Sequence, residues 1–439
     1  MERRLLILGA GESGVGTAVL GQQKGYEVLV SDSGTIKQKY KSLLEQHDIR
    51  YEEGGHHAAL AFFPTEVVKS PGIPEDADIV VQLRKQAGQI MLTVVSEIEF
   101  ASRYTSAKML CVTGSNGKTT TTSLLYDICT RAGLNVGLGG NIGRSLALQV
   151  AEQQHDYYVL ELSSFQLDGM FDFRADVAVL LNITPDHLDR YGFCFQNYVN
   201  SKFRIIRNQR SDNSFVYWSE DPVIKRELPA HDIGARLCPF SFAEATHILP
   251  VTAEELSLKG KHNLLNSMAA TLAARAIGIS DEVIAESLRS FKGVEHRLQF
   301  VREIGGVRFV NDSKATNVDS CFYALDSMTT PTVLILGGKD KGNDYSQIDD
   351  LVREKCHTLV FMGLHNEKLH EHFDNMTMRD GKSISIIDTD NIDAAVSGAY
   401  AAAHEGDTVL LSPCCASFDL FQSYEDRGKQ FMTIVKNLK

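Results

Sequence analysis

The segment 114–120, which reads Gly-Ser-Asn-Gly-Lys-Thr-Thr, carries the strongest chemical signal in the chain. It follows the apolar run 108–113 and precedes an expected helix, which is where a phosphate-binding loop belongs. Backbone N–H groups at a helix N-terminus favour phosphate oxygens, Lys118 can reach the outer phosphates of a nucleotide, and the Thr119 hydroxyl can bind Mg²⁺. The standard loop has a glycine where Val112 stands, so the sequence predicts a shortened phosphate-binding loop.

A second glycine turn lies near the N-terminus. Residues 9–14 read Gly-Ala-Gly-Glu-Ser-Gly after the apolar run 5–8, and Asp32 follows 18 residues after the last glycine. In a dinucleotide site such glycines admit a pyrophosphate and the acid holds a ribose. The pattern leaves three readings open: an NAD site, a site for another nucleotide diphosphate, and a tight structural turn.

Two ionisable residues stand at the ends of expected strands, where ligand sites of α/β proteins form. Glu161 follows the strand 157–160. It is either a Mg²⁺ ligand or a solvent-facing acid at the strand end. His187 lies in a Pro-Asp-His turn after the strand 177–181, as a site residue or a structural histidine. Lys202 belongs to an expected helix over 195–208, and its position alone indicates no more than a solvated helix face.

Composition excludes several classes of protein. The 439 residues carry 44 Lys and Arg against 56 Asp and Glu, a net charge of −12 that argues against a general nucleic-acid binder. The apolar runs are shorter than the roughly 20 residues that a membrane span needs. The run 5–9 is too short for a signal-peptide core, and none of the eight cysteines are spaced as Cys-x-x-Cys, so reduced thiols and a cytoplasmic location are expected.

Apolar runs alternate with helical stretches, and the pattern restarts twice, which predicts an α/β fold with three domains. We expect a Rossmann-like domain over 1–100, a P-loop ATPase-like domain with a parallel or mixed sheet over 101–298, and a Rossmann-like domain over 299–439. Further strands are expected at 28–30, 67–68, 90–92, 307–310, 333–336, 359–362, 384–387 and 409–411, and helices at 261–277, 280–290 and 390–403.

Segment 114–120 resembles the ATP loop of the Mur ligases and folylpolyglutamate synthetases, which are three-domain, ATP-dependent amide ligases. Other segments resemble family motifs in the same order along nearly the whole chain; these are 140–143, 161–167, 182–189, 262–266, 296–297, 311–317 and 411–417. Residues 312–317 and 412–417 favour the family member that adds D-glutamate.

The resemblance implies an acid–D-amino-acid ligase of peptidoglycan precursor synthesis. ATP would phosphorylate the carboxylate of UDP-N-acetylmuramoyl-L-alanine, and the amine of D-glutamate would attack the acyl phosphate. Such a site must bring anions together, so Mg²⁺ and cationic side chains should dominate it. ATP, two Mg²⁺ ions and these two substrates are the expected ligands, with no nucleic acid. The oligomeric state is left open, with a monomer favoured.

The resemblance also implies roles for residues of the second domain and its boundary. The ATP-binding set would be Gly114, Ser115, Asn116, Gly117, Lys118, Thr119, Thr120, Asn266 at the adenine, Arg297 at the phosphates and Asp312 near the ribose or phosphates. Thr119 and Glu161 would bind one Mg²⁺, while His187 and a carbamylated Lys202 would help hold a second. Lys118, Glu161, His187 and Lys202 would be the catalytic residues.

The incoming amino acid carries two carboxylates, so cations and hydroxyls should surround it. By resemblance these are Lys314, Thr316, Lys341 and Ser417, with Phe418 and Tyr424 nearby. Lys339 is an alternative to Lys341. Tyr424 stands where the family often has phenylalanine, which keeps an aromatic wall and adds a hydroxyl.

In this family the first glycine turn binds UDP. The resemblance assigns the UDP-substrate to Ser13, Asp32, Ser33, Gly72, Asn141 and His187, with the loop 70–73 as the second wall of the uridine pocket. Glu12 and Gly34 depart from the family pattern. An acid so close to a diphosphate is unfavourable, so we expect Glu12 to point away.

Three rivals remain at this stage. An NAD-dependent oxidoreductase would leave the second loop without a task, and a non-enzymatic nucleotide-binding regulator would bind ATP without releasing phosphate. A neighbouring muramyl ligase or a folylpolyglutamate synthetase is the third, although the folate enzymes begin directly with the ATP domain. Ligands shared among three domains would require hinge closure. Because all expected ligands are anions, recognition must depend on local cations rather than on the net charge.

Overall fold

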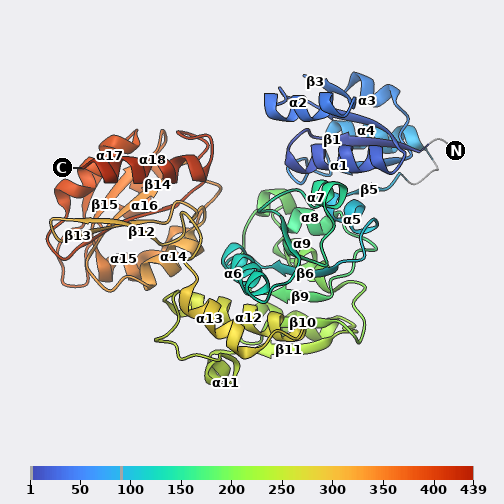
Figure 1. Cartoon of the computed structure of the whole chain (residues 1–439). Helices are drawn as coiled ribbons and strands as arrows, with labels where there is room; N and C mark the ends of the chain where they lie inside the picture. Colours follow the sequence, from blue (N-terminus) through green and yellow to red (C-terminus); the bar gives the residue numbers. More distant parts are fainter. Residues whose placement is uncertain (1–2, 89–91, 439) are drawn as a thin grey trace. The chain divides into compact units, whose positions relative to one another are not determined.

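The computed structural model describes residues 3–88 and 92–438 and contains three β-sheets covered by helices, which confirms the α/β fold class. The chain divides into two compact units, Met1–Leu256 with Leu265–Phe291 and Ser257–Leu264 with Lys292–Lys439. The first unit holds two sheets and the second holds the third (Figure 1). The expected domain boundaries near residues 100 and 298 stay predictions. Within the described ranges no helix is long and apolar enough to cross a membrane.

The first sheet is parallel and doubly wound, with strand order β3-β2-β1-β4-β5. Its strands are β1 (Arg4–Leu8), β2 (Glu27–Asp32), β3 (Arg50–Glu53), β4 (Glu66–Lys69) and β5 (Val94–Val95). The helices are α1 (Glu12–Gln23), α2 (Gln38–Gln46), α3 (His57–Ala61), α4 (Asp78–Ala87) and α5 (Glu97–Ser102). The strand order reverses between β1 and β4, so the loops after these two strands meet at one crevice.

The second sheet is also parallel, with order β11-β10-β9-β6-β8-β7. Its strands are β6 (Lys108–Thr113), β7 (Val136–Gly140), β8 (Tyr157–Glu161), β9 (Val177–Leu180), β10 (Ser214–Trp218) and β11 (Arg236–Phe240). The larger helices are α6 (Lys118–Arg131), α7 (Leu146–Glu152), α8 (Ser164–Asp168), α9 (Phe195–Phe203), α10 (Pro222–Glu227), α12 (Lys261–Ala276) and α13 (Asp281–Ser290). Shorter helical turns are η1 (Leu188–Tyr191), η2 (Arg204–Ile206), η3 (Leu228–Ala230), η4 (Phe242–Glu244) and α11 (Ala245–Ile248). Because β6 lies between β8 and β9, the loop after β6 is flanked by the ends of both.

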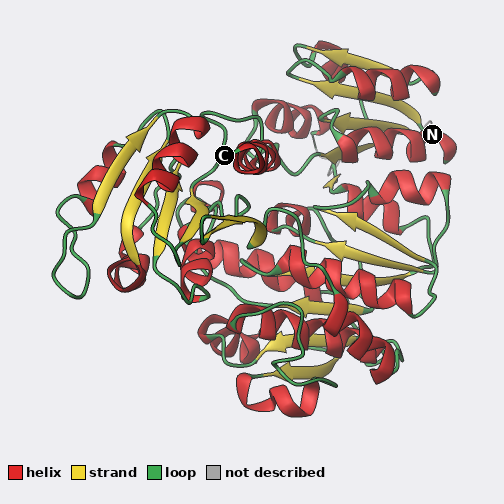
Figure 2. Cartoon of the chain, turned by 60° about the vertical axis from the view of Figure 1, so that its left-hand side comes forward, coloured by secondary structure: helices red, strands yellow, loops and turns green. Residues whose placement is uncertain are grey.

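The third sheet is mixed, with order β12-β13-β17-β14-β15-β16 and one antiparallel pair, β12 with β13. Its strands are β12 (Gln299–Ile304), β13 (Val307–Asn311), β14 (Thr332–Gly337), β15 (Cys356–Met362), β16 (Ser385–Thr389) and β17 (Thr408–Cys414). The helical elements are α14 (Val318–Asp326), η5 (Tyr345–Ile348), α15 (Asp349–Lys355), α16 (Glu367–Phe373), α17 (Ile392–Ala402) and α18 (Tyr424–Asn437). Two apolar clusters, one on each side of this sheet, pack under helices. Figure 2 shows helices alongside the strands of this sheet.

Some expected elements differ from the structure. Of the strand expected at 90–92, residues 90 and 91 lie outside the described residues, Leu92 belongs to no strand, and β5 begins at Val94. The helix expected to reach residue 208 ends at Phe203 and continues as the 3₁₀ turn η2. The chain also forms β3, β7, β10, β11 and β12, for which the apolar pattern gave no expectation.

Close packing requires glycine at the first glycine turn and in the helix that follows it, whether or not a ligand binds there. Gly9 has φ +94°, and a Cβ on Gly14 would collide with the carbonyl oxygen of Gly9. A Cβ on Gly16 would collide with the side chain of Ser145, the residue that caps α7. These glycines therefore bring α1 against its own strand and against the second sheet's α7.

Candidate active site

The loop predicted to bind phosphate lies between β6 and the start of α6. Gly114 has φ +151° and Gly117, which caps α6, has φ +83°. A Cβ on Gly117 would collide with the side chain of Asn266, whose Oδ1 accepts a hydrogen bond of 3.2 Å from the Thr121 hydroxyl. Asn266 is buried in α12, so in this structure it supports the loop from behind.

The segment after β9 forms hydrogen bonds with the loop and fixes its backbone. The Ser115 amide donates to the carbonyl of Asn182 at 2.9 Å, and the Asn116 amide donates to the Asn182 side chain at 2.8 Å. The Ser115 hydroxyl donates to the Thr184 carbonyl at 2.8 Å. Sequence reasoning missed the role of Asn182, although it belongs to a motif that the resemblance identified. These contacts pre-organise the loop without any phosphate.

Lys118 folds back over the loop. Its Nζ donates to the carbonyl oxygens of Gly114 at 2.7 Å and of Ser115 at 2.6 Å. Thr119 and Thr120 follow it at the start of α6 and are buried. The cation and the α6 N-terminus thus meet at one point, which suits the outer phosphates of a nucleotide.

Glu161, at the end of β8, is almost fully buried. Its Oε1 accepts a hydrogen bond of 2.8 Å from the Asn141 side chain, while its Oε2 has no hydrogen-bond partner. The backbone of Gly140 packs so tightly against the Glu161 carbonyl that a Cβ there would collide. A buried carboxylate oxygen without a partner is costly, and a divalent cation would satisfy it. Glu161 therefore fits the expected Mg²⁺ site.

Lys202 is not on a solvated helix face. Its side chain is fully buried on α9, and its Nζ donates to the carbonyl of Gly114 at 2.9 Å and to the Thr113 hydroxyl at 3.2 Å. Burial, followed by repulsion from Lys118, holds the pKa of Lys202 well below its usual range. Burial therefore favours the neutral form of this amine, which is the form that reacts with carbon dioxide.

His187 lies at the start of η1 with φ +53°. Its Nε2 is 3.5 Å from the Asp186 carboxylate, and its ring packs edge-on against Phe165 with centroids 5.1 Å apart. The guanidinium of Arg190 lies over the ring of Phe165, 4.3 Å from its centroid. Strain at a non-glycine residue and a half-exposed imidazole are typical of a functional position.

The two loops of the first sheet meet at its reversal point. The Asp32 carboxylate accepts the Ala10 amide at 2.7 Å and the Gly34 amide at 2.8 Å, so it already bridges the glycine turn and the end of β2. Ser13 is half-buried on α1, and Ser33 and Gly72 are exposed. Arg190 donates to the carbonyl oxygens of Pro71 and Gly72 at 3.2 Å, which links this crevice to the His187 turn.

Glu12 is exposed at the start of α1 and accepts a hydrogen bond of 3.2 Å from the Tyr40 hydroxyl. Tyr40 belongs to α2, so the acid is drawn along the protein surface. That Glu12 points away from a bound diphosphate stays a prediction.

In the second unit, Asp312 follows β13 and is fully buried. Its carboxylate accepts the Leu298 amide at 3.1 Å and the Ser412 hydroxyl at 3.0 Å. Burial raises the pKa of Asp312 to about 6, partly offset by the charge of Arg297. Arg297 is half-buried, and its Nε has no hydrogen-bond partner.

The residues expected at the amino acid divide into a buried and an exposed group. Lys314 donates to the Tyr424 hydroxyl at 3.0 Å, so the hydroxyl absent from phenylalanine orients this lysine. Thr316 is half-buried and Ser417 is buried, whereas Phe418 and Lys341 are exposed. The alternative, Lys339, forms a backbone bridge with Ala416, which holds the turn beside Ser417.

Arg427 is a residue that sequence reasoning missed. It is fully buried on α18, and its guanidinium donates to the Ser313 hydroxyl and carbonyl at 2.9 Å each and to the Cys415 carbonyl at 3.3 Å. Burial lowers the pKa of Arg427 to about 10. This one side chain ties together the two loops that carry Lys314 and Ser417. An arginine in an otherwise amphipathic helix gives no signal of this role.

Family models cover most of the chain. The Mur ligase middle domain matches residues 112–274, the Mur ligase glutamate ligase domain matches 296–415, and the MurD N-terminal domain matches 4–79. Among solved structures, the UDP-N-acetylmuramate-alanine ligase of Thermotoga maritima has the same fold, with a TM-score of 0.61 at 15% identity over 99% of this chain and 100% of that one.

Curated relatives are similar over their full length. The chain is 58% identical to the UDP-N-acetylmuramoylalanine–D-glutamate ligase of Bacteroides fragilis, over 99% of this chain and 100% of that protein. It is 52% identical to the enzyme of the same name from Porphyromonas gingivalis, over 99% of this chain and 98% of that one. With three matching domain models and relatives of this similarity, the chain belongs to the Mur ligase family of ATP-dependent, amide-bond-forming ligases.

Proposed function

We propose that this protein joins D-glutamate to UDP-N-acetylmuramoyl-L-alanine at the expense of ATP, as a step of peptidoglycan precursor synthesis. The substrates follow from the names of the relatives that it matches from end to end. The chemistry is supported above all by the meeting of Lys118 and Lys202 on one carbonyl oxygen, that of Gly114, in the phosphate-binding loop.

In the first half-reaction, a carboxylate oxygen of the UDP-substrate attacks the γ-phosphorus of ATP, and ADP leaves. The loop 114–117 and the N-terminus of α6 hold the phosphates, and Lys118 supplies positive charge where it is needed. When bound, Mg²⁺ withdraws charge from the phosphate oxygens. Glu161 and Thr119 are the side chains that would hold one ion.

We propose that Lys202 is carbamylated and, with His187, helps to hold a second Mg²⁺. The lone pair of the neutral amine attacks the carbon of carbon dioxide, one C–O π bond opens to a C–O⁻, and the nitrogen loses a proton to solvent, so the neutral amine becomes a carbamate anion. A carbamate offers oxygen atoms, which Mg²⁺ prefers to nitrogen. Burial holds the pKa of Lys202 below its usual range, which supports this modification because the reactive neutral amine is favoured.

In the second half-reaction, the amine of D-glutamate attacks the carbonyl carbon of the acyl phosphate, loses a proton, and phosphate leaves. Lys314 and Thr316 would bind the carboxylates of the amino acid, with Ser417, Phe418, Tyr424 and Lys341 nearby. Arg427 keeps the two loops in register through its contacts with Ser313 and Cys415.

The first sheet would bind the uridine diphosphate at its reversal point, through Ser13, Asp32, Ser33 and Gly72. Arg190, which follows the His187 turn, contacts the loop at residues 71–72. These contacts support the proposal that one substrate molecule reaches both the first sheet and the His187 turn. Asn141, which bonds to Glu161, would face the reacting end. Because ATP is the phosphate donor, we expect the reaction to take place in the cytoplasm. We also expect the enzyme to act as a monomer.

The direct test is mass spectrometry of the product. The protein, Mg²⁺ and ATP should convert UDP-N-acetylmuramoyl-L-alanine into a species heavier by one glutamate less one water, with D-glutamate but not with L-glutamate. Oxygen-18 placed in the substrate carboxylate should appear in the released phosphate, as an acyl phosphate requires. Product without isotope transfer would overturn the acyl-phosphate mechanism, and no product with either glutamate would overturn the proposed function.

A further inference from the structure

Three side chains of the second unit converge at the amino ends of β15 and β17. His357 is the second residue of β15, and His404 and Asp407 lie in the turn between α17 and β17. Among the described residues, this is the one group of three His, Cys, Asp or Glu side chains whose ligand atoms all lie within 4.8 Å of one another.

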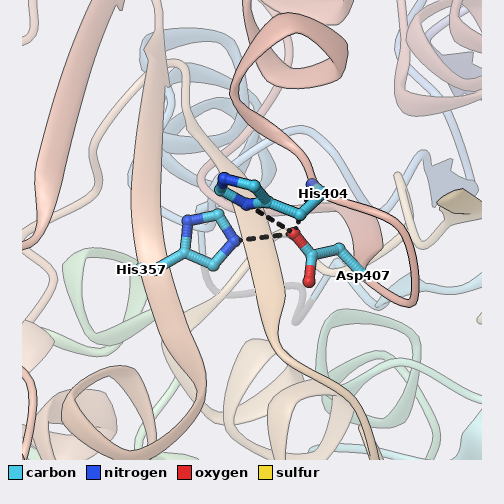
Figure 3. A group of neighbouring side chains, drawn as sticks. All are labelled: His357, His404 and Asp407. Atoms are coloured by element: carbon cyan, nitrogen blue, oxygen red, sulfur yellow. Dashed lines mark hydrogen bonds and ion pairs between the residues drawn. The ribbon is translucent and has the colours of Figure 1, made fainter.

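The two imidazole rings both contact the same carboxylate oxygen of Asp407 (Figure 3). Nε2 of His357 lies 2.9 Å from Oδ2 of Asp407, and Nδ1 of His404 lies 3.5 Å from the same atom. Donor atoms bound at the usual zinc distance of about 2.1 Å are separated by about 3.0 to 3.4 Å in square and tetrahedral arrangements. The two nitrogen–oxygen separations bracket this range, and the ligand atoms of the two imidazoles lie within 4.8 Å of each other, so small rotations of the side chains would bring all three around one ion.

The surroundings of the cluster suit a metal ligand set. Asp407 is buried and held by the His404 amide, which donates to Oδ2 at 2.7 Å. Nδ1 of His357 lies 2.9 Å from the Thr358 hydroxyl, which can accept its proton and leave Nε2 free to bind a metal. The His404 side chain is 81% exposed, which provides an entry path and room for water as a fourth ligand.

We propose that His357, His404 and Asp407 form a site for one divalent ion of the zinc class. Two imidazoles and a carboxylate select Zn²⁺, Co²⁺ or Ni²⁺ over Mg²⁺, which prefers oxygen ligands. The site lies at the amino ends of β15 and β17, whereas Ser412 and Ser417 lie toward or beyond the carboxyl end of β17. The ion therefore connects the turn before β17 to β15 and stabilises the third sheet. It takes no part in the amide-forming reaction.

The test is a Zn²⁺ titration of the full chain against a chromophoric chelator, with excess Mg²⁺ present. The unmodified protein should bind one more equivalent than His404→Ala and His357→Gln. Thr358→Val should weaken that site by about tenfold, the loss expected for an outer hydrogen-bond partner. His365→Ala, which removes an exposed histidine of the same unit, is the matched control and should bind like the unmodified protein.

Thermal unfolding supplies a second readout, which does not depend on the chelator. One equivalent of Zn²⁺ should raise the unfolding midpoint of the unmodified protein and leave that of His404→Ala unchanged. Equal binding by the unmodified protein and both histidine variants would overturn the proposal. An unfolding midpoint of the unmodified protein that does not respond to Zn²⁺ would also overturn it.

Discussion

Nζ of Lys202 lies 2.9 Å from the carbonyl oxygen of Gly114, which also accepts a hydrogen bond of 2.7 Å from Nζ of Lys118. Two amines on one carbonyl cannot both be charged without strong repulsion. Burial decides between them, because Lys202 is fully enclosed and Lys118 is not. The loop therefore has Lys118 beside it to contact phosphate, and next to it a buried amine, Lys202, whose neutral form is favoured.

Replacement of Lys202 tests the proposed carbamate. Lys202→Ala should lower kcat by at least about 100-fold, the upper end of the loss caused by disturbing a metal's outer partners. A short carboxylate such as propionate should restore part of the activity by filling the space and supplying oxygen. Labelled bicarbonate should also give a carbamate carbon signal in the unmodified protein.

Lys225→Ala, at an exposed lysine of α10, is the control and should retain full activity. Full activity of Lys202→Ala at low bicarbonate would rule out a catalytic carbamate.

Glu161→Gln tests the metal role of the buried carboxylate. The amide can still accept the hydrogen bond from Asn141, so the fold should persist, but the charge that attracts the ion is lost. We expect kcat/KM to fall by at least about 100-fold and the Mg²⁺ concentration for half-maximal rate to rise. Mg²⁺ titrations of ATP turnover measure both.

Glu152→Gln, at an exposed glutamate paired with Arg144, should behave like the unmodified protein. A Glu161→Gln protein with an unchanged Mg²⁺ dependence would show that Glu161 does not bind the ion.

Arg427→Lys tests whether the buried arginine positions the amino-acid loops. Lysine cannot reach Ser313 and Cys415 with one planar group, so buried acceptors lose partners at a cost of about 1–3 kcal/mol in stability. We expect the KM for D-glutamate to rise much more than the KM for ATP. Steady-state kinetics and urea unfolding measure the two effects.

Lys429→Ala, at an exposed position of the same helix, is the matched control. If the KM for D-glutamate stays constant while stability falls, Arg427 has a structural role alone.

Glu97 gives a prediction for stability against pH. It is fully buried, its Oε1 accepts from the Ser145 hydroxyl and the Ala147 amide, and its Oε2 has no partner. Burial raises the pKa of Glu97 to about 7. Between the unfolded value of about 4.3 and this value, the folded protein holds a proton that the unfolded chain has lost. Stability therefore falls as pH rises through this window, by about 3–4 kcal/mol in all.

Glu97→Gln should remove that pH dependence, because an amide mimics the protonated acid. Urea unfolding at pH 5 and pH 8 should show a smaller difference for this variant than for the unmodified protein or for Glu286→Gln, an exposed control. Equal differences in all three proteins would contradict the assigned pKa.

Local patterns made the phosphate-binding loop and most central strands predictable. The loop needs only a strand, two glycines, a lysine and a helix in succession, and buried parallel strands read as apolar runs. Two of the missed strands lack such a run, because β7 contains three glycines and β11 is mostly exposed and contains a proline. The missed strand β10 does contain a buried apolar run, at residues 215–217. Periodicity cannot identify strands whose stability depends on their neighbours.

Tertiary contacts made the rest of the candidate site unpredictable. Lys202 and Arg427 occupy helices whose sequences suggest solvated faces, and only the fold shows that both are fully buried. The Oε2 atom of Glu161, at the end of β8, is buried without a partner. Asn182, after β9, contacts the phosphate-binding loop that follows β6. Both features depend on strands that are separated in the sequence. Resemblance to a family pointed to Lys202, Glu161 and the Asn182 motif, whereas nothing in the sequence pointed to Arg427.

The central claim is that ATP turnover depends on one particular amino acid. Phosphate release should be measured with ATP, Mg²⁺ and UDP-N-acetylmuramoyl-L-alanine across a panel of D- and L-amino acids. The account predicts release with D-glutamate and no more than background with L-glutamate, L-lysine or D-alanine. Release with a different amino acid, or with none of the panel, would contradict it.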